Sequence, residues 1–136
     1  MNVLETGLYS TLAAGTALTA LLADGTASIF NQVAPRNSTF PYVEFGLQGG
    51  GDENMCPARF KNYLYRVKAV SDVSMKTAGE IDDAVDALLH GATLTVNGWH
   101  NFWCRRDSDF RYAEFDPEGN AIWHAGGVYR IRLSDP

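Results

Sequence analysis

The stretch that decides the fold reads FRYAEFDPEGNAIWHAGGVYRIRL and covers residues 110–133. At its centre, residues 116–120 are Asp-Pro-Glu-Gly-Asn, residue types that chain-reversing turns favour. Aromatic and β-branched residues, which favour strands, flank this turn on both sides. The stretch therefore predicts an antiparallel hairpin with strands near 110–115 and 121–133. In the second strand, the two glycines at 126–127 indicate a bulge or bend.

A second hairpin is predicted immediately before the first. Asn97 and Gly98 form a dipeptide that type I′ turns favour, because both central residues of such a turn need positive φ. Residues 94–96 and 99–104 flank this dipeptide and supply two strands. The last third of the chain is therefore expected to contribute four strands.

Residues 74–91 predict a regular amphipathic helix. Ser74 is a residue type that caps helix N-termini, and Gly91 is one that ends helices in the left-handed conformation. The expected buried arc consists of Ala78, Ile81, Ala84, Val85, Leu88 and Leu89, and the opposite arc of Gly79, Asp82, Asp83 and Asp86. This division is typical of a helix that covers one face of a sheet.

An N-terminal helix is predicted at 3–22, where Leu4, Leu8 and Leu12 recur every four residues. Gly15, followed by a threonine, predicts a break that ends one helix and starts a short second one.

Three strands are predicted between the two helical regions, at 29–33, 40–47 and 60–73. The segment Gly-Gly-Gly-Asp-Glu-Asn at 49–54 has almost no apolar content and high backbone freedom. It is therefore predicted to be a mobile loop.

The predicted order is a helix, three strands, a second helix and four strands. Such segregation favours an α+β fold with a mainly antiparallel β-sheet and two α-helices packed on one face. At 136 residues the chain has the usual size of one domain, so residues 1–136 are expected to form a single domain.

The formal net charge of −5 disfavours binding to phosphate backbones and anionic membranes. The basic residues of the last third are Arg105, Arg106, Arg130 and Arg132, and they are diluted by Asp107, Asp109 and Glu114. They predict a solvated, salt-paired strand face, so neither membrane association nor sequence-specific nucleic-acid binding is expected. The N-terminus resembles neither a signal peptide nor a membrane span of about 20 apolar residues, which predicts a protein made and used in the cytoplasm unless it leaves inside a larger assembly.

No cofactor is expected, because the sequence has no nucleophile elbow, phosphate-binding loop or zinc-protease motif. Cys56 and Cys104 form no CxxC pair and predict reduced thiols. A metal-assisted hydrolase that uses His100, Cys104 and His124 stays open as an alternative, because His100 and Cys104 are spaced to share a strand face.

Aromatic residues crowd the last third of the chain: Trp99, Phe102, Trp103, Phe110, Tyr112, Phe115, Trp123 and Tyr129. Some of these rings are expected in the sheet core. Because Phe102 and Trp103 are adjacent, strand alternation predicts one ring on each face and therefore aromatic surface away from the helices. A second alternative is a small ligand- or protein-binding module with an aromatic groove lined by Trp99, Trp123 or Tyr129.

The order and spacing of several segments resemble the tail-completion or tail-terminator proteins of long-tailed bacteriophages and prophages. The segments are the helix end at 18–22, the stretch 29–35, Phe40-Pro41-Tyr42-Val43, the helix end at 88–90, the stretch 94–98, and the closing hairpin at 116–119 with His124 and the strand 128–133. The resemblance spans nearly the whole chain.

This resemblance implies a structural α+β subunit, without catalytic residues, that assembles into a homo-oligomeric ring, typically a hexamer. Such a ring stops tail-tube growth, so the implied partners are further copies of the chain, the tail tube protein and the head-completion or connector protein. The implied place is the tail-neck region of the virion, after assembly in the host cytoplasm. The candidate interface residues are Gly49, Gly50, Gly51, Asp52, Glu53, Asn54, Trp99, Phe102, Trp103, Arg105 and Arg106.

Overall fold

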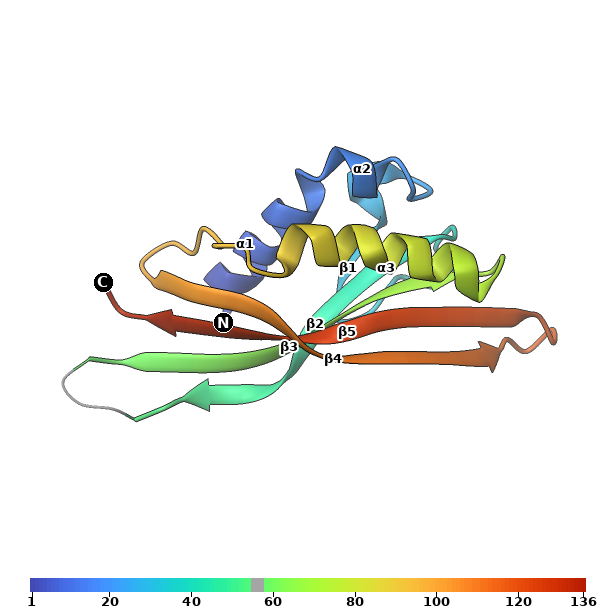
Figure 1. Ribbon diagram of the computed structural model, residues 1–136. Helices are drawn as coiled ribbons and strands as arrows, with labels where there is room; N and C mark the ends of the chain where they lie inside the picture. The colour runs from blue at the N-terminus through green and yellow to red at the C-terminus, as the bar shows by residue number, and fades with distance from the viewer. Residues whose placement is uncertain (55–57) are drawn as a thin grey trace.

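A five-stranded sheet forms one layer of the protein and the helices form the other (Figure 1). The computed structural model describes residues 1–54 and 58–136. The elements are α1 (Asn2–Ala13), α2 (Thr16–Thr19), the 3₁₀ helix η1 (Gly25–Ser28), β1 (Ile29–Asn31), β2 (Tyr42–Asp52), β3 (Phe60–Ser71), α3 (Met75–Leu89), β4 (His100–Phe115) and β5 (Ala121–Ser134). The expectation of an α+β fold with helices on one face of the sheet is confirmed.

The strands lie in the order β1-β2-β3-β5-β4. Every neighbouring pair is antiparallel except β1 with β2, which run parallel over three residues from Ile29↔Val43 onwards. The helix-facing side of the sheet carries buried Val43, Phe45, Tyr65 and Val67, and it packs on leucines of α1 and α3. Among the described residues, no helix is long and apolar enough to cross a membrane.

Helix α3 begins and ends where the sequence predicts. The Ser74 hydroxyl accepts a hydrogen bond from the Thr77 N–H at 3.1 Å, and Gly91 adopts φ +76° just beyond the last turn. The prediction that Gly79 and Asp82 lie on the arc opposite the buried one is wrong, because both residues are buried. Both face arginine side chains of β4, which reach up to the helix and cover this flank.

The predicted break in the N-terminal helix is confirmed between α1 and α2. Leu4, Leu8, Leu12 and Leu18 are fully buried. A side chain at Gly15 would overlap the Leu88 side chain of α3, so glycine at this position permits the close approach of the two helical segments.

Two of the four strands expected in the last third merge into one. Residues 100–115 form the single strand β4, because β5 offers a continuous ladder with which it pairs along almost its whole length. Residues 94–96 are not a strand, and only an isolated bridge joins Val96 to Trp99. Gly98 has φ +80° but Asn97 does not have positive φ, so the expected type I′ turn is wrong.

The closing turn is confirmed. The Asp116 N–H donates to the Asn120 carbonyl at 2.9 Å, and the Gly119 N–H donates to the Asp116 carbonyl at 3.0 Å. The Asp116 carboxylate also accepts hydrogen bonds from the backbone N–H groups of Glu118 and Asn120. This turn joins β4 to β5 in a hairpin that extends past the end of the helix layer (Figure 1).

The expected bulge at 126–127 lies on the neighbouring strand instead. The pairing between β4 and β5 shifts twice, at Phe102 and at Asp107, and both extra residues belong to β4. Gly127 leaves room for the Arg106 side chain, because a Cβ at position 127 would lie 2.6 Å from the Arg106 guanidinium carbon.

Candidate interaction surface

Two stretches of strand edge have no partner strand within the described chain. Strand β4 forms one border of the sheet over residues 100–115. At the other border, β1 covers only residues 43–45 of β2, so residues 46–52 are open. Unpaired edge strands present backbone donors and acceptors to other chains, so both borders are sites for strand pairing between molecules.

The outer face, defined as the face of the sheet turned away from the helices, lies uncovered across β2, β3, β5 and β4 (Figure 1). The strand register places on it Phe60, Asn62, Leu64, Arg66, Lys68, Trp103, Arg105, Phe110, Tyr112, Glu114, His124, Val128, Arg130 and Arg132. The outer face therefore combines aromatic rings with several cationic side chains.

Phe102 and Trp103 both lie on the outer face, and the expectation that they point to opposite faces is wrong. The Phe102 ring stacks on Phe60 at a centroid distance of 5.9 Å. The Arg132 guanidinium lies 5.1 Å from the Phe60 ring centre and 5.3 Å from that of Trp103. The physical reason is the bulge at Phe102, which inserts one residue and interrupts the alternation of side chains. Trp99, by contrast, is partly buried and packs against the hydrophobic core.

The arginines of the outer face are paired in part, as the sequence interpretation expects. Arg132 contacts Glu53 at 2.8 Å, and Arg130 lies 3.6 Å from Asp107. Arg66 and Arg105 have no carboxylate within ion-pair distance among the described residues. The Arg105 guanidinium lies 4.8 Å from the centre of the Trp103 ring.

The prediction that 49–54 forms a mobile loop is wrong for residues 49–52, and residues 53–54 follow the strand. Strand β2 continues to Asp52 and pairs with β3, because backbone hydrogen bonding needs no side chains and tolerates glycines. The Asp52 carboxylate binds Lys61 at 2.5 Å and Arg59 at 2.7 Å, and these two cations lower its pKa, with the Lys61 hydrogen bond as the larger cause. Their ion pairs close the end of the β2–β3 hairpin.

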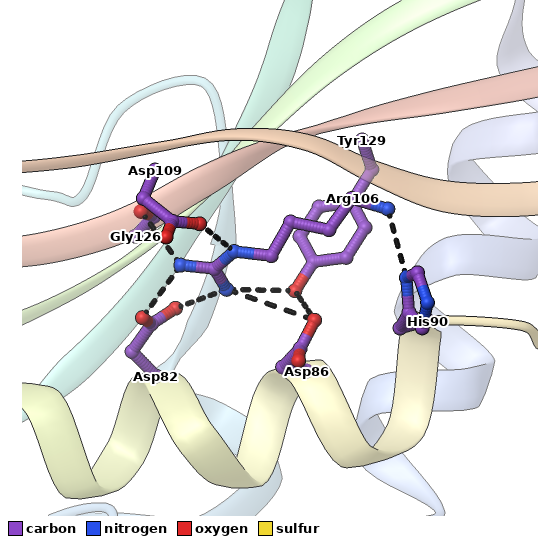
Figure 2. Close-up of polar contacts among 7 residues, drawn as sticks. All are labelled: Asp82, Asp86, His90, Arg106, Asp109, Gly126 and Tyr129. Atoms are coloured by element: carbon purple, nitrogen blue, oxygen red, sulfur yellow. Dashed lines mark hydrogen bonds and ion pairs between the residues drawn. The ribbon is translucent and has the colours of Figure 1, made fainter.

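Arg106 points in the opposite direction from Arg105 and lies within a network between β4 and α3 (Figure 2). Its guanidinium donates to both carboxylate oxygens of Asp82, at 2.9 and 2.8 Å, and to the Gly126 carbonyl at 3.0 Å. It also donates to Asp109 and, at 3.1 Å, to the Tyr129 hydroxyl.

The network is held from several elements. Tyr129 of β5 donates its hydroxyl hydrogen to Asp86 of α3 at 3.0 Å, and the Arg106 backbone N–H donates to His90 Nδ1 at 3.1 Å. The hydrogen bond with Asp82 is the largest cause that raises the pKa of Arg106, and burial raises that of Tyr129. We call this network the clamp; it consists of Asp82, Asp86, Arg106, Asp109, Gly126 and Tyr129. The guanidinium at its centre is permanently charged, and its role is structural.

Sequence reasoning missed this clamp. Asp82 and Asp86 lie four residues apart on one helix, which is a signal for two carboxylates on one face, but their partner is remote in sequence. The candidate interface role of Arg106 stays a prediction, since most of its side chain lies inside the network.

A second polar cluster surrounds His124 on the outer face. His124 is 4% exposed, its ring stacks on Tyr112 at 4.4 Å, and its Nε2 lies 2.7 Å from Glu114 Oε1. Its Nδ1 is buried and has no hydrogen-bond partner among residues 1–54 and 58–136. Burial is the main cause that lowers the pKa of His124, Lys68 adds to it, and the Glu114 contact opposes both.

The metal-assisted hydrolase alternative needs His100, Cys104 and His124 to lie close together, and they do not. The bulge at Phe102 places His100 on the outer face and Cys104 on the helix-facing side. His124 pairs with Tyr112, seven residues along β5 from the partner of Cys104, or about 23 Å. Burial raises the pKa of the Cys104 thiol to about 12. Cys56 lies outside the described residues.

An apolar cavity of about 740 Å³ lies beside α1. It is lined by Val3, Thr6, Gly7, Ser10, Thr11, Ala14, Leu88, Thr95 and Asn97. None of the three aromatic residues expected to form a binding groove lines it, and Tyr129 is fully buried.

The family described as Tail completion protein gp17 matches residues 6–133 of this sequence. The chain belongs to this family. The match runs from within α1 to within β5, so it covers the sheet, the clamp and both open edges. This tail completion family member is a structural tail protein of bacteriophage type, as the resemblance implies.

Among solved structures, a chain of a particle described as a virion of native gene transfer agent (GTA) shares the fold of this tail completion protein. The TM-score is 0.80 at 20% sequence identity, and the alignment covers 96% of this chain and 94% of the other. No curated protein sequence matches.

Proposed function

We propose that this tail completion protein forms a homo-oligomeric ring, a hexamer in the form that the resemblance implies, which caps the tail tube and joins it to the head connector. The observation that carries the proposal is the pair of open sheet edges on β2 and β4. In a closed ring each edge is satisfied by the next copy, whereas a monomer leaves both available for uncontrolled pairing.

The other parts of the proposal follow from the role in a tail. The partners are copies of the chain, the tail tube protein and the head-completion or connector protein. The protein resides in the tail-neck region of the virion after assembly in the host cytoplasm, and its role is structural rather than catalytic. Family membership and the shared fold with a chain of the gene transfer agent virion support this placement.

Light scattering coupled to gel filtration tests the proposal on the full chain, alone and with purified tail tube protein. We expect a mass that is a multiple of 14.9 kDa, with rings visible by negative-stain microscopy. A strictly monomeric mass in both samples would contradict the proposal.

A second candidate is a small binding module without a phage assembly role, which the cavity beside α1 favours. This candidate predicts a monomer that binds an apolar dye such as anilinonaphthalene sulfonate. Ala14→Trp, which fills the cavity from the C-terminal end of α1, should abolish dye binding in that case. Dye binding that Ala14→Trp leaves unchanged would exclude the cavity as the site.

A further inference from the structure

Four arginines form one patch on the outer face. The arginine patch consists of Arg66, Arg105, Arg130 and Arg132 on three neighbouring strands. Arg105 and Arg130 are directly opposite each other across β4 and β5, and Arg66 lies diagonal to Arg130 through the pairs Arg66↔Val128 and Leu64↔Arg130. Like charges opposite each other destabilise a sheet, so folding alone gives no reason for this arrangement.

The arginine patch keeps an excess of positive charge. Of the carboxylates that the structure describes, only those of Asp107 and Glu53 lie within ion-pair distance of it, and both bind arginines other than Arg66 and Arg105. An anionic partner therefore suits this surface.

The tip of the β4–β5 hairpin has the opposite charge. The acidic tip, residues 114–120, carries Glu114, Asp116 and Glu118, and no lysine or arginine occurs at 112–129. Phe115 within it is 74% exposed and has no other ring against it among the described residues. The tip is therefore both charged and apolar, which is typical of a segment that binds another surface.

One copy cannot bring these two features together. Arg130 lies nine residues along β5 from Ala121, where the tip ends, and this separation is about 30 Å in a strand. The hairpin also extends away from the rest of the sheet (Figure 1). A contact between the acidic tip and the arginine patch therefore needs two copies.

The surface next to the arginine patch has room for the exposed ring. Gly49 and Gly51 of β2 pair with Leu64 and Asn62, which in turn pair with Arg130 and Arg132. A Cβ built on either glycine meets nothing within 4 Å. Bare backbone of this kind permits close approach by a partner's side chain.

We propose that the acidic tip of one copy binds the arginine patch of the next copy, so that the chains associate head to tail. Phe115 then lies on the bare glycine surface while Glu118, in the turn, approaches the arginines. Such a contact joins different surfaces of the two copies, which is the type of interface that generates rings. The inference rests on the proposed ring and names a further contact between its neighbouring copies.

Charge reversal tests the contact. The patch variant Arg66→Glu/Arg105→Glu and the tip variant Glu114→Arg/Glu118→Arg should each weaken self-association by about tenfold or more, measured by sedimentation velocity in 0.15 M salt. The variant with all four changes restores opposite charges and the net charge of −5, so it should associate again. Failure of the four-change variant to recover association would overturn the inference.

The controls distinguish loss of the tip-to-patch contact from effects of net charge and from loss of folding. Arg36→Glu/Lys76→Glu changes the net charge as the patch variant does, at two exposed positions, and should leave association unchanged. Because Glu114 contacts His124, Glu118→Arg alone serves as a second tip variant in case the double change unfolds the hairpin. Far-ultraviolet circular dichroism verifies that each variant is folded.

The outcomes also distinguish this inference from the proposed function. If the natural protein stays monomeric with tube protein present, the ring itself fails. If it assembles and both reversals leave assembly intact, only the tip-to-patch contact is wrong. Binding of fluorescent random-sequence duplex DNA that the patch variant loses, with assembly unchanged, would assign the arginine patch to nucleic acid instead.

Discussion

Arg106 of the edge strand β4 and Asp82 of helix α3 form a two-point ion pair, with Nη1–Oδ1 and Nη2–Oδ2 distances of 2.9 and 2.8 Å. Asp82 is 5% exposed. The pair joins the border of the sheet to the helix layer, and it holds one side of β4 while the free edge and the outer face stay available to other chains.

Replacing Arg106 should destabilise the protein strongly. Arg106→Met leaves the Asp82 carboxylate buried without its partner, which costs about 3–5 kcal/mol of unfolding free energy. Urea denaturation followed by circular dichroism measures the loss. The matched control is Arg105→Met, one residue away on the exposed face, with an expected change under about 1 kcal/mol.

The double change Arg106→Met/Asp82→Leu removes both charges, so it should recover a large part of the stability that Arg106→Met loses. Equal losses for Arg105→Met and Arg106→Met would show that the clamp contributes nothing specific.

Two glycines should respond differently to alanine. At Gly127 the added Cβ would lie 2.6 Å from the Arg106 guanidinium, so Gly127→Ala should cost about 1–3 kcal/mol through overpacking and displacement of the clamp. At Gly51 nothing lies within 4 Å and φ is not positive, so Gly51→Ala should change stability by less than about 1 kcal/mol. Thermal denaturation of the two variants compares them directly, and similar midpoints would contradict the expectation.

His124 should make stability fall in mild acid. Its pKa is lowered in the folded protein, so below the ordinary value of about 6.5 the unfolded chain binds a proton that the folded chain does not. The contribution is therefore present above that pH and is lost as the pH falls toward the folded pKa. Protonation would also place an N–H at the buried Nδ1, for which the described part of the chain offers no acceptor.

Urea denaturation at several pH values between 7.5 and about 5 measures this dependence. In His124→Gln the slope over this range should decrease relative to the natural protein. An unchanged slope would mean that other groups cause it.

Alanine substitutions at Trp103 and Phe45 should have different effects, because Trp103 lies on the surface and Phe45 in the core. Phe45 is 2% exposed, so Phe45→Ala should lower the unfolding free energy by about 3–5 kcal/mol. Trp103 lies on the outer face between the guanidinium groups of Arg105 and Arg132, so Trp103→Ala should cost less in stability and should weaken assembly. Unfolding and sedimentation experiments on both variants give the comparison, and a core-sized loss for Trp103→Ala would place it in the core.

Local features were predictable where neighbouring residues supply the cause. Ser74 caps α3 through an N–H three residues away, and Asp116 closes its turn through residues 118 and 120. The break at Gly15 and the antiparallel character of the sheet likewise follow from residue types and periodicity. Each of these depends on interactions within a few positions of the chain.

The wrong predictions concern features that depend on pairing between segments far apart in the sequence. The glycine stretch after Gly49 is strand rather than loop, because β3 provides a partner for its backbone. The bulge at Phe102 shifts the alternation of side chains on β4 as far as the second bulge at Asp107, and no local signal marks either position.

By itself, the sequence determined the boundaries of α3, the closing turn and the α+β class, since these depend on short-range hydrogen bonds and on periodic apolar residues. Only the tertiary structure decided that Arg106 points toward Asp82 while Arg105 points outward. The reason is that strand register, which sets the face of each side chain, is fixed by pairing between segments that lie far apart in the chain.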